Sequence, residues 1–350
     1  MNKTFRRTDL LWLAFTGLIA LAPLVPAIGS NSFLMHVLIL VMLYACMSQA
    51  WNIIGGYGGQ TSFGHAVFFG IGAYGAGMAV VTYGLPPWPG ALAGIVSAAV
   101  VAVLISYPCF KLSGHYFAIA TFAIVEIFNR MFLVWDWVGG ALGLDYMIVE
   151  EGFANLVWYD SKTGYFYCAL TLFALIFGIV RFLEGHRFGY YLRAVRAGQE
   201  TAESLGVNST AVKLSAMALS AALAALCGAF FVQYNLRVDP AMVMSLDMSM
   251  KFVLVTILGG AGTLAGPLVG AAVLVPLQEF TRAKWGGLGG GVDLIIFGLL
   301  IILIVVKQPA GITGIVRDIA KRRGRKAAAE KGGASPVSYT HLTLPTIYPV

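Results

Sequence analysis

The stretch FLMHVLILVMLYACMSQAWNII, residues 33–54, contains no Asp, Glu, Lys or Arg. A helix rises 1.5 Å per residue, so a run of this length crosses the ~30 Å of hydrocarbon in a bilayer. Similar apolar runs recur along the chain. A membrane β-barrel would instead show short segments of alternating hydrophobicity. The sequence therefore predicts a helical protein that spans the membrane several times.

The composition supports a membrane protein. Of the 350 residues, 59% are hydrophobic and only 11% are charged, whereas soluble domains carry roughly 25% charged residues. This excludes an ordinary soluble enzyme and a disordered chain. The four cysteines, Cys46, Cys109, Cys168 and Cys227, lie far apart in apolar runs. We expect them to be buried and unpaired, with no disulfide framework.

Hydropathy predicts an all-α polytopic bundle of about ten transmembrane helices within a transmembrane unit of residues 1–315. The first span is expected to remain uncleaved, and the short eighth span could be re-entrant or broken. The parity of the spans permits two inverted five-helix halves. The predicted spans are 10–28, 33–54, 62–83, 89–109, 115–135, 165–183, 212–234, 246–258, 264–280 and 292–307.

Charge distribution sets the predicted orientation. The net charge is +7, and most basic residues lie near the N-terminus, in the segment 184–211 and after the tenth span. Ten spans place these three regions on one side, which the positive-inside rule identifies as the cytoplasm. Both termini are then cytoplasmic. We expect residues 316–336 to form a basic, disordered tail and 337–350 to be a non-native scar.

Motifs for enzymatic chemistry are absent from the sequence. There is no GxxxxGK[ST] loop for nucleotide phosphates, no HExxH zinc pair and no GxSxG nucleophile turn. We therefore expect no catalytic residues, no metal and no cofactor. The energy for any transport must come from a partner protein or from an ion gradient.

The segment RFGYYLRAVRAGQETAESLGVNSTAVK, residues 187–213, is the strongest polar feature. It predicts a short helix over 199–205 that Gly206 ends, because glycine tolerates the left-handed conformation at a helix C-terminus. Asn208 or Ser209 then caps the next membrane helix. Two interpretations stay open: a solvated loop, or a helix that docks on a cytoplasmic partner.

Seven glycines fall in the window 55–72, which argues against a continuous helix at its start. Irregular backbone at membrane depth must be buried in protein or line a cavity. These residues could therefore serve tight packing, or unwound backbone could line a translocation path. The candidate path residues here are Gly58, Gly59, Gln60, Thr61, Ser62 and His65.

The fifth predicted span carries Glu126, Asn129 and Arg130 near mid-membrane. Charged groups at that depth cost about 2.5–3.5 kcal/mol on insertion scales. Glu126 and Arg130 are four residues apart on one helix face, so we expect them to pair and relieve both costs. The pair could be structural, at a helix or subunit contact, or it could line the translocation route.

Several motifs carry a family resemblance. Glu200 to Gly206 looks like the E-A-A-x-x-x-G loop of ABC importer permeases, although Thr201 departs from it and the later leucine-proline is missing. The stretch NIIGGYGGQTSFGHAVFFGIGA, residues 52–73, resembles branched-chain amino acid permeases of the LivM type. Residues 116–126, 139–144, 259–270 and 297–311 are also similar to that family, and the likeness covers roughly residues 10–315.

The resemblance implies a permease subunit of a bacterial inner-membrane ABC importer for branched-chain or related amino acids. The implied partners are a second, similar permease subunit, two cytoplasmic ATPases and a periplasmic amino-acid-binding protein. Glu200, Thr201, Ala202 and Gly206 would couple the subunit to an ATPase. The alternative is an ion-coupled secondary transporter of small polar solutes, with Glu126 as its coupling carboxylate. A membrane scaffold is a further alternative, which the short cytoplasmic tail disfavours.

Overall fold

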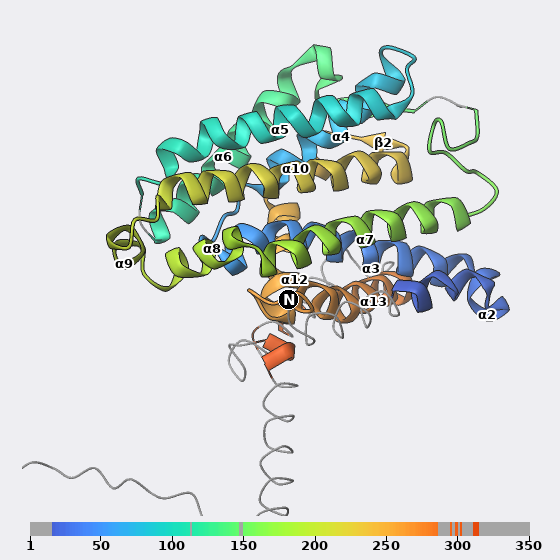
Figure 1. Cartoon of the computed structure of the whole chain (residues 1–350). Helices are drawn as coiled ribbons and strands as arrows, with labels where there is room; N and C mark the ends of the chain where they lie inside the picture. The colour runs from blue at the N-terminus through green and yellow to red at the C-terminus, as the bar shows by residue number, and fades with distance from the viewer. Residues whose placement is uncertain are drawn as a thin grey trace, which may run out of the picture.

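The computed structural model describes residues 16–112, 114–146 and 150–285, with a few further positions between 295 and 314. Within these ranges the chain is almost entirely helical (Figure 1). The predicted tenth span, 292–307, is described only at isolated positions. The predicted tail segments, 316–336 and 337–350, lie outside the described residues.

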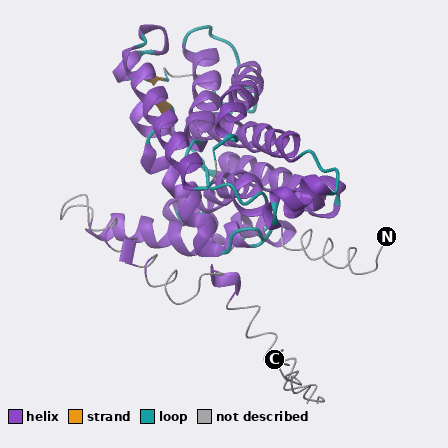
Figure 2. Ribbon diagram, turned by 90° about the vertical axis from the view of Figure 1, so that its left-hand side faces the viewer, coloured by secondary structure: helices purple, strands orange, loops and turns teal. Residues whose placement is uncertain are grey.

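Most elements follow one another with short connections, as Figure 2 shows from the side, but a long loop leads from β1 to α7. Two short strands, β1 (Leu144–Asp145) and β2 (Arg237–Val238), pair antiparallel. Most helices in chain order are η1 (Ala22–Leu24), α2 (Pro26–Gly29), α3 (Ser32–Asn52), η2 (Ile53–Tyr57), α4 (His65–Val81), α5 (Pro87–Cys109), α6 (His115–Val134), η3 (Asp136–Val138), η4 (Gly140–Leu142) and α7 (Thr163–Gly185). They continue with α8 (Arg187–Ala197), α9 (Gln199–Ser204), α10 (Ser209–Asn235), α11 (Pro240–Val243), α12 (Leu246–Gly259) and α13 (Gly266–Trp285).

Six helical segments in the described part of the chain are long and apolar enough to cross a membrane. They are 32–57, 87–109, 115–134, 163–185, 209–235 and 240–259. The apolar helix α4 is shorter, and α13 carries Glu279, Arg282 and Lys284 toward its end. Predicted spans two to nine each coincide with a helix, which confirms the all-α polytopic bundle.

The predicted first span, 10–28, differs from the structure, which describes it only from Thr16. Helix ends at Ala20, and the short helices η1 and α2 follow in its place. Pro23 and Pro26 explain the break, because proline has no N–H to donate within a helix. A continuous span to residue 28 is therefore wrong.

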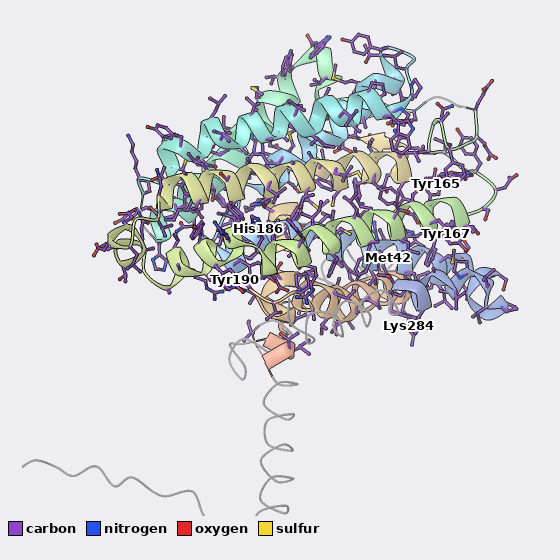
Figure 3. All side chains as sticks on the ribbon, in the orientation of Figure 1. Met42, Tyr165, Tyr167, His186, Tyr190 and Lys284 are labelled. Carbon is purple, nitrogen blue, oxygen red and sulfur yellow. The ribbon has the colours of Figure 1, made fainter. Side chains whose placement is uncertain are left out.

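The long helices lie side by side, and their connections gather at two ends (Figure 1). We name the end with α8 and α9 the basic end, because it carries Arg181, Arg187, Arg193 and Arg196. The opposite end, with the α6–α7 connection and the strands, is the acidic end. It carries Asp136, Asp145, Glu150, Glu151 and Asp160. Figure 3 shows His186 and Tyr190 at the basic end, and Tyr165 and Tyr167 toward the acidic end.

Glycines let α4 and α10 pack closely at the centre of the bundle. A Cβ atom on Gly72 would lie 2.0 Å from the Ala225 carbonyl oxygen, and one on Gly228 would lie 1.9 Å from the Phe69 carbonyl oxygen. Only glycine permits backbones this close, as in small-residue contacts between other membrane helices. At Gly72 the structure therefore supports tight packing, one of the two alternatives left open for the glycine-rich window.

We expect Gly72→Ala to destabilise the protein by about 1–3 kcal/mol, the usual cost of forcing extra volume into a packed core. Gly178→Ala on α7 is the matched control, because a Cβ atom there meets nothing within 4 Å. That change should stabilise its helix by up to about 1 kcal/mol. Thermal unfolding in detergent measures both. Equal unfolding temperatures for the two variants would contradict the packing argument.

Candidate functional site: two broken helices and their link to the basic end

The first break in a membrane helix follows α3. The chain continues as the π-helix η2 and then runs irregularly over residues 58–64 until α4 begins at His65. Backbone N–H groups of Gly58 and Gln60 donate to the carbonyls of Ile53 and Ile54, at 3.1 and 3.0 Å. Gly59 has a φ of +71°, which glycine adopts without strain. The predicted irregular backbone is confirmed, and π-helical turns are frequent at functional sites.

The second break separates α12 from α13, and the two breaks meet at the basic end of the bundle. Asn52 joins them from the end of α3. Its Oδ1 accepts a 2.8 Å hydrogen bond from the Gly262 N–H, and its Nδ2 donates to the Thr263 carbonyl at 3.0 Å. A Cβ atom on Gly56 would lie 2.5 Å from the Gly262 nitrogen. Segments 210 residues apart in sequence are thus held as one unit.

Arg196, on the last turn of α8, lies against both breaks. Its guanidinium donates a hydrogen bond to the Gly56 carbonyl in η2. A Cβ atom on Gly59 would lie 2.8 Å from the Arg196 Cγ, and one on Gly262 would lie 2.5 Å from its Nη1. The glycines therefore leave room for the arginine, and the arginine connects α8 to both broken helices.

Glu184 supplies a second link between α7 and η2. The Tyr57 hydroxyl donates to the Glu184 Oε1 at 2.7 Å. Arg181 donates to the Glu184 Oε2 at 3.3 Å, and Arg193 donates to the Glu184 carbonyl at 3.0 Å. The junction of α7 and α8 is therefore fixed to the π-helix at two points, through Glu184 and through Arg196.

The helix α9 lies beyond this junction and matches the short helix predicted over 199–205. Gly206 follows it with a φ of +84°, and the Gly206 N–H donates to the Glu203 carbonyl at 2.9 Å. Asn208 caps α10 through a 2.9 Å hydrogen bond from the Ala211 N–H. The predicted glycine stop and the asparagine cap are both confirmed.

Side-chain hydrogen bonds fix α9 onto α10. Lys213 donates to the Gln199 Oε1 at 2.7 Å, and Gln199 donates to the Glu203 Oε1 at 3.0 Å. The Glu203 carboxylate also accepts a hydrogen bond from the Ser209 hydroxyl. The hydrogen bond from Ser209, and to a smaller extent that from Gln199, lowers the pKa of the Glu203 carboxyl. Ala202 is buried beneath the helix. The α9 segment is thus a fixed projection rather than a loose loop.

The residues predicted to line a path differ in exposure. Gly59 and Thr61 are exposed, Gln60 is half-buried, and Gly58 is buried. His65 is fully buried, its Nε2 lies 2.7 Å from the Ser220 Oγ, and its ring packs edge-on against Phe68. In this structure Gln60 and Thr61 can meet solvent at the first break. Their part in a path, and that of His65, stays a prediction.

The predicted pair on α6 forms, since the Arg130 Nε lies 2.8 Å from the Glu126 Oε1. It is not buried within this chain, because the two side chains are 74% and 51% exposed. Asn129 points the other way and donates to the carbonyls of Pro240 and Met244 at 3.0 and 3.3 Å. The helix α6 therefore contacts the bundle through Asn129 and presents the ion pair on its outward face.

The sequence did not single out Asn52, Tyr57, Glu184 or Arg196. Their roles arise from contacts between distant segments, which no local pattern reports. No local signal distinguished Arg196, because it is one of three arginines within residues 187–196. The expected absence of disulfides among the four cysteines agrees with the structure. Cys46, Cys109, Cys168 and Cys227 are all free thiols.

The model of a protein family described as "Branched-chain amino acid transport system / permease component" matches residues 33–305. The chain belongs to this family. The permease is 27% identical, over 83% of its length and 72% of the relative's, to the high-affinity branched-chain amino acid transport system permease protein LivM of Salmonella typhimurium. It is 24% identical to the corresponding LivH protein of Escherichia coli K12, over 77% of its own length and 91% of the relative's.

A sugar transporter also matches over a shorter region. The permease is 26% identical to the fructose import permease protein FruF of Bifidobacterium longum, over 41% of each chain. No solved structure matches the permease. The relatives therefore support a membrane permease of branched-chain amino acid transport systems, as the resemblance of residues 52–73 and 200–206 predicted.

Proposed function

We propose that the permease is a membrane subunit of an ABC importer that carries branched-chain or related amino acids across the bacterial inner membrane. It moves the substrate without changing it covalently. The family and the LivM and LivH relatives support this proposal. Because relatives of both names match, the membrane core would pair this chain with a second, similar permease. Two cytoplasmic ATPases and a periplasmic amino-acid-binding protein would complete the importer.

The basic end would face the cytoplasm. Four arginines on α7 and α8 lie there, whereas the acidic residues between α6 and α7 lie at the opposite end. Positive side chains collect on cytoplasmic segments of membrane proteins. With this orientation α9 would face the ATPases, and the N- and C-termini would also be cytoplasmic if the chain has the ten spans that its sequence predicts.

The observation that carries the proposal is the position of α9. It projects at the basic end, is fixed to α10 by hydrogen bonds, and is followed directly by Leu205, which is 80% exposed. An exposed leucine on a fixed polar helix suits insertion into a groove of a partner protein. Glu200, Thr201, Ala202 and Gly206 would form or shape this docking segment.

The contacts described above give the docking segment a route to the membrane. Movement of α9 by the ATPases would move α8, and Arg196 and Glu184 would transmit it to both broken helices. Nucleotide-bound ATPases and a loaded binding protein must favour different cavity states, since only differential binding shifts such an equilibrium. The broken helices at Gly58–Gly64 and Gly260–Gly262 are where the backbone can change most easily.

A cysteine crosslink tests the docking of α9. Leu205→Cys should crosslink to the ATPase partner in assembled importer. Leu142→Cys, at the acidic end, is the matched control, because Leu142 is 81% exposed. The permease alone should hydrolyse no ATP. Hydrolysis by the lone chain, or a crosslink from position 142 but not from position 205, would overturn the assignment.

A further inference from the structure

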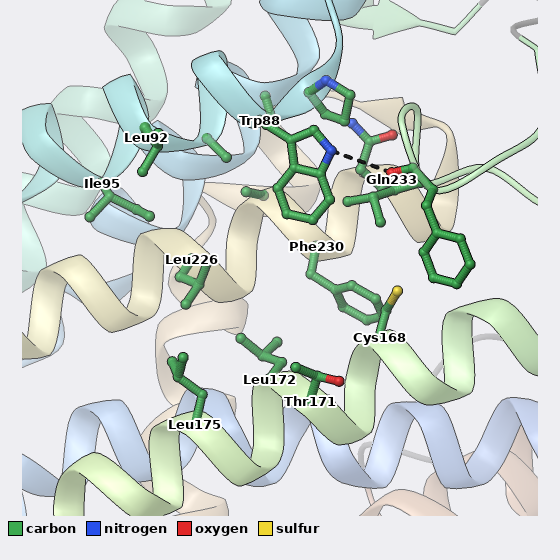
Figure 4. Close-up of a pocket in the computed structure, with 16 residues that line it drawn as sticks. Trp88, Leu92, Ile95, Cys168, Thr171, Leu172, Leu175, Leu226, Phe230 and Gln233 are labelled. Atoms are coloured by element: carbon green, nitrogen blue, oxygen red, sulfur yellow. Dashed lines mark hydrogen bonds between the residues drawn. The ribbon is translucent and has the colours of Figure 1, made fainter.

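A cavity of about 480 Å³ lies between α5, α7 and α10, away from the broken helices. Its size falls within the ~300–1,000 Å³ typical of small-molecule pockets. Figure 4 shows Trp88, Leu92 and Ile95 of α5 on one side and Leu172 and Leu175 of α7 on the other. Leu226 and Phe230 of α10 lie between these walls.

The lining of this cavity is almost entirely apolar and contains no charged side chain. Thr171 is satisfied internally, since its hydroxyl donates to the Tyr167 carbonyl at 2.9 Å. An amino-acid substrate needs partners for both its ammonium and its carboxylate, because unpaired charges are costly in an apolar site. The cavity therefore does not suit the transported substrate.

The cavity opens toward hydrocarbon. Leu92 and Leu175 on its rim are exposed, and the surface of α5 continues from Leu92 through exposed Val96, Val100 and Leu104. The helix α5 has no charged residue over its whole length. No residue of α6, which presents the outward ion pair, lines the cavity. A bilayer would therefore supply its occupant from the side.

One buried polar atom marks the end of the cavity nearest the acidic end of the bundle. Gln233 is 1% exposed, and its Nε2 donates to the Tyr146 hydroxyl at 3.0 Å. Among the residues that the structure describes, none forms a hydrogen bond with its Oε1. A buried acceptor without a donor costs free energy, so an occupant with a donor at this end would stabilise the site.

Acidic side chains lie near the same end. Phe153 lines the cavity, and its carbonyl accepts a hydrogen bond from the Trp88 indole at 3.3 Å. The connection that carries Phe153 also holds Glu150, Glu151 and Asp160, all exposed, against one cation, Lys162, which donates to the Ser32 carbonyl at 3.2 Å. These carboxylates favour a cationic head group over an anionic one. The required donor and the local charge point to the same chemistry, a primary ammonium.

We propose that this cavity binds one acyl chain of a phospholipid with an ammonium head group, inserted sideways from the bilayer with its head group beside Trp88 and Gln233. A chain in this position fills apolar volume that would otherwise lack van der Waals contacts. The site is distinct from the two broken helices, and the inference does not depend on the proposed transport function.

Photo-crosslinking in membrane vesicles that contain the full chain tests this site. The probes are phosphatidylethanolamine, phosphatidylglycerol and phosphatidylcholine that carry the same photoreactive acyl chain. The expected adducts map to lining residues such as Leu172 and Leu226, with the highest yield for phosphatidylethanolamine. Adducts spread evenly along the exposed face of α5, or a higher yield for phosphatidylglycerol, would overturn the proposal.

Matched variants on α5 sharpen the test. Ala91 lines the cavity, whereas Ala93, two residues along the same helix, is exposed and does not line it. Ala91→Trp should lower the yield of cavity adducts severalfold, and Ala93→Trp should leave it unchanged. Gln233→Leu should keep the adducts but reduce the preference for phosphatidylethanolamine. Unchanged labelling in Ala91→Trp, or loss of labelling when excess leucine is added, would overturn the lipid site.

Discussion

Arg196→Ala is expected to lower coupled uptake roughly tenfold to a hundredfold while the ATPase subunits still bind and still hydrolyse ATP. Arg196 is the contact that joins α8 to both broken helices, through the Gly56 carbonyl and the space left by Gly59 and Gly262. Hydrogen bonds from charged groups contribute about 1.5–3 kcal/mol. If the loss of this hydrogen-bond free energy appears in transport, uptake falls roughly tenfold to a hundredfold, since about 1.4 kcal/mol corresponds to each factor of ten.

The measurement is substrate uptake per ATP hydrolysed in vesicles that contain the assembled importer. Arg187→Ala is the control, because Arg187 is an exposed arginine at the start of the same helix and its loss removes the same charge. Arg196→Lys keeps the charge but not the planar guanidinium, so it should restore uptake only in part. Equal uptake ratios for Arg196→Ala and Arg187→Ala would contradict transmission through Arg196.

A second variant reaches the same contact from the opposite side. Gly262 has a φ of +78°, and a Cβ atom there would lie 2.5 Å from the Arg196 Nη1. Gly262→Ala should therefore displace the guanidinium and reproduce the loss of coupling. If Gly262→Ala assembles and transports normally, the contact between Arg196 and the second break has no functional role.

Local patterns in the sequence predicted the elements that depend on local chemistry. Long apolar runs located α3 to α7, α10, α12 and α13, and glycine and asparagine preferences located the end of α9 and the start of α10. They did not locate α8 or α11. The first span was wrong where Pro23 and Pro26 divide it. Contacts such as Asn52 with Gly262, or Arg196 with Gly56, join segments far apart in the chain. No spacing rule reports such contacts, so the link between α8 and the broken helices could not be predicted.

The α6 helix shows where spacing misleads. Glu126, Asn129 and Arg130 are close in sequence on the fifth predicted span. An α-helix has about 3.6 residues per turn, so neighbouring residues face different directions. Packing then decides which polar side chain points into the bundle. Asn129 took the inner face and bound the α11 region, so the charged pair was left outside. The sequence correctly predicted the pairing, but it could not predict which surface the pair would occupy.

An outward ion pair on a membrane helix cannot remain in contact with lipid at low cost. One unpaired charge near mid-membrane costs about 2.5–3.5 kcal/mol. The face of α6 that carries Glu126 and Arg130 is therefore expected to lie against the second permease subunit or a water-filled path. Both positions require the charges to stay paired, which makes the two side chains mutually dependent.

Glu126→Leu or Arg130→Leu alone should reduce recovery of the two-permease complex by roughly a hundredfold, because each leaves one charge unpaired. The free-energy cost of about 2.5–3.5 kcal/mol converts to this factor at about 1.4 kcal/mol for each factor of ten. The double variant should recover much of this loss. Asp145→Leu is the control, because Asp145 lies 3.5 Å from Arg237 in an exposed pair at the acidic end. Such exposed pairs contribute about 0–1 kcal/mol, so this variant should assemble normally.

The double variant also separates the two roles that the pair could have. If the pair is structural, a complex with leucine at both positions assembles and transports. If the pair lines the translocation route, the same complex assembles but uptake is lost, because the polar surface that meets the substrate is gone. If the double variant assembles no better than the sum of the single losses, the side chains act independently and the pairing of Glu126 with Arg130 has no energetic role.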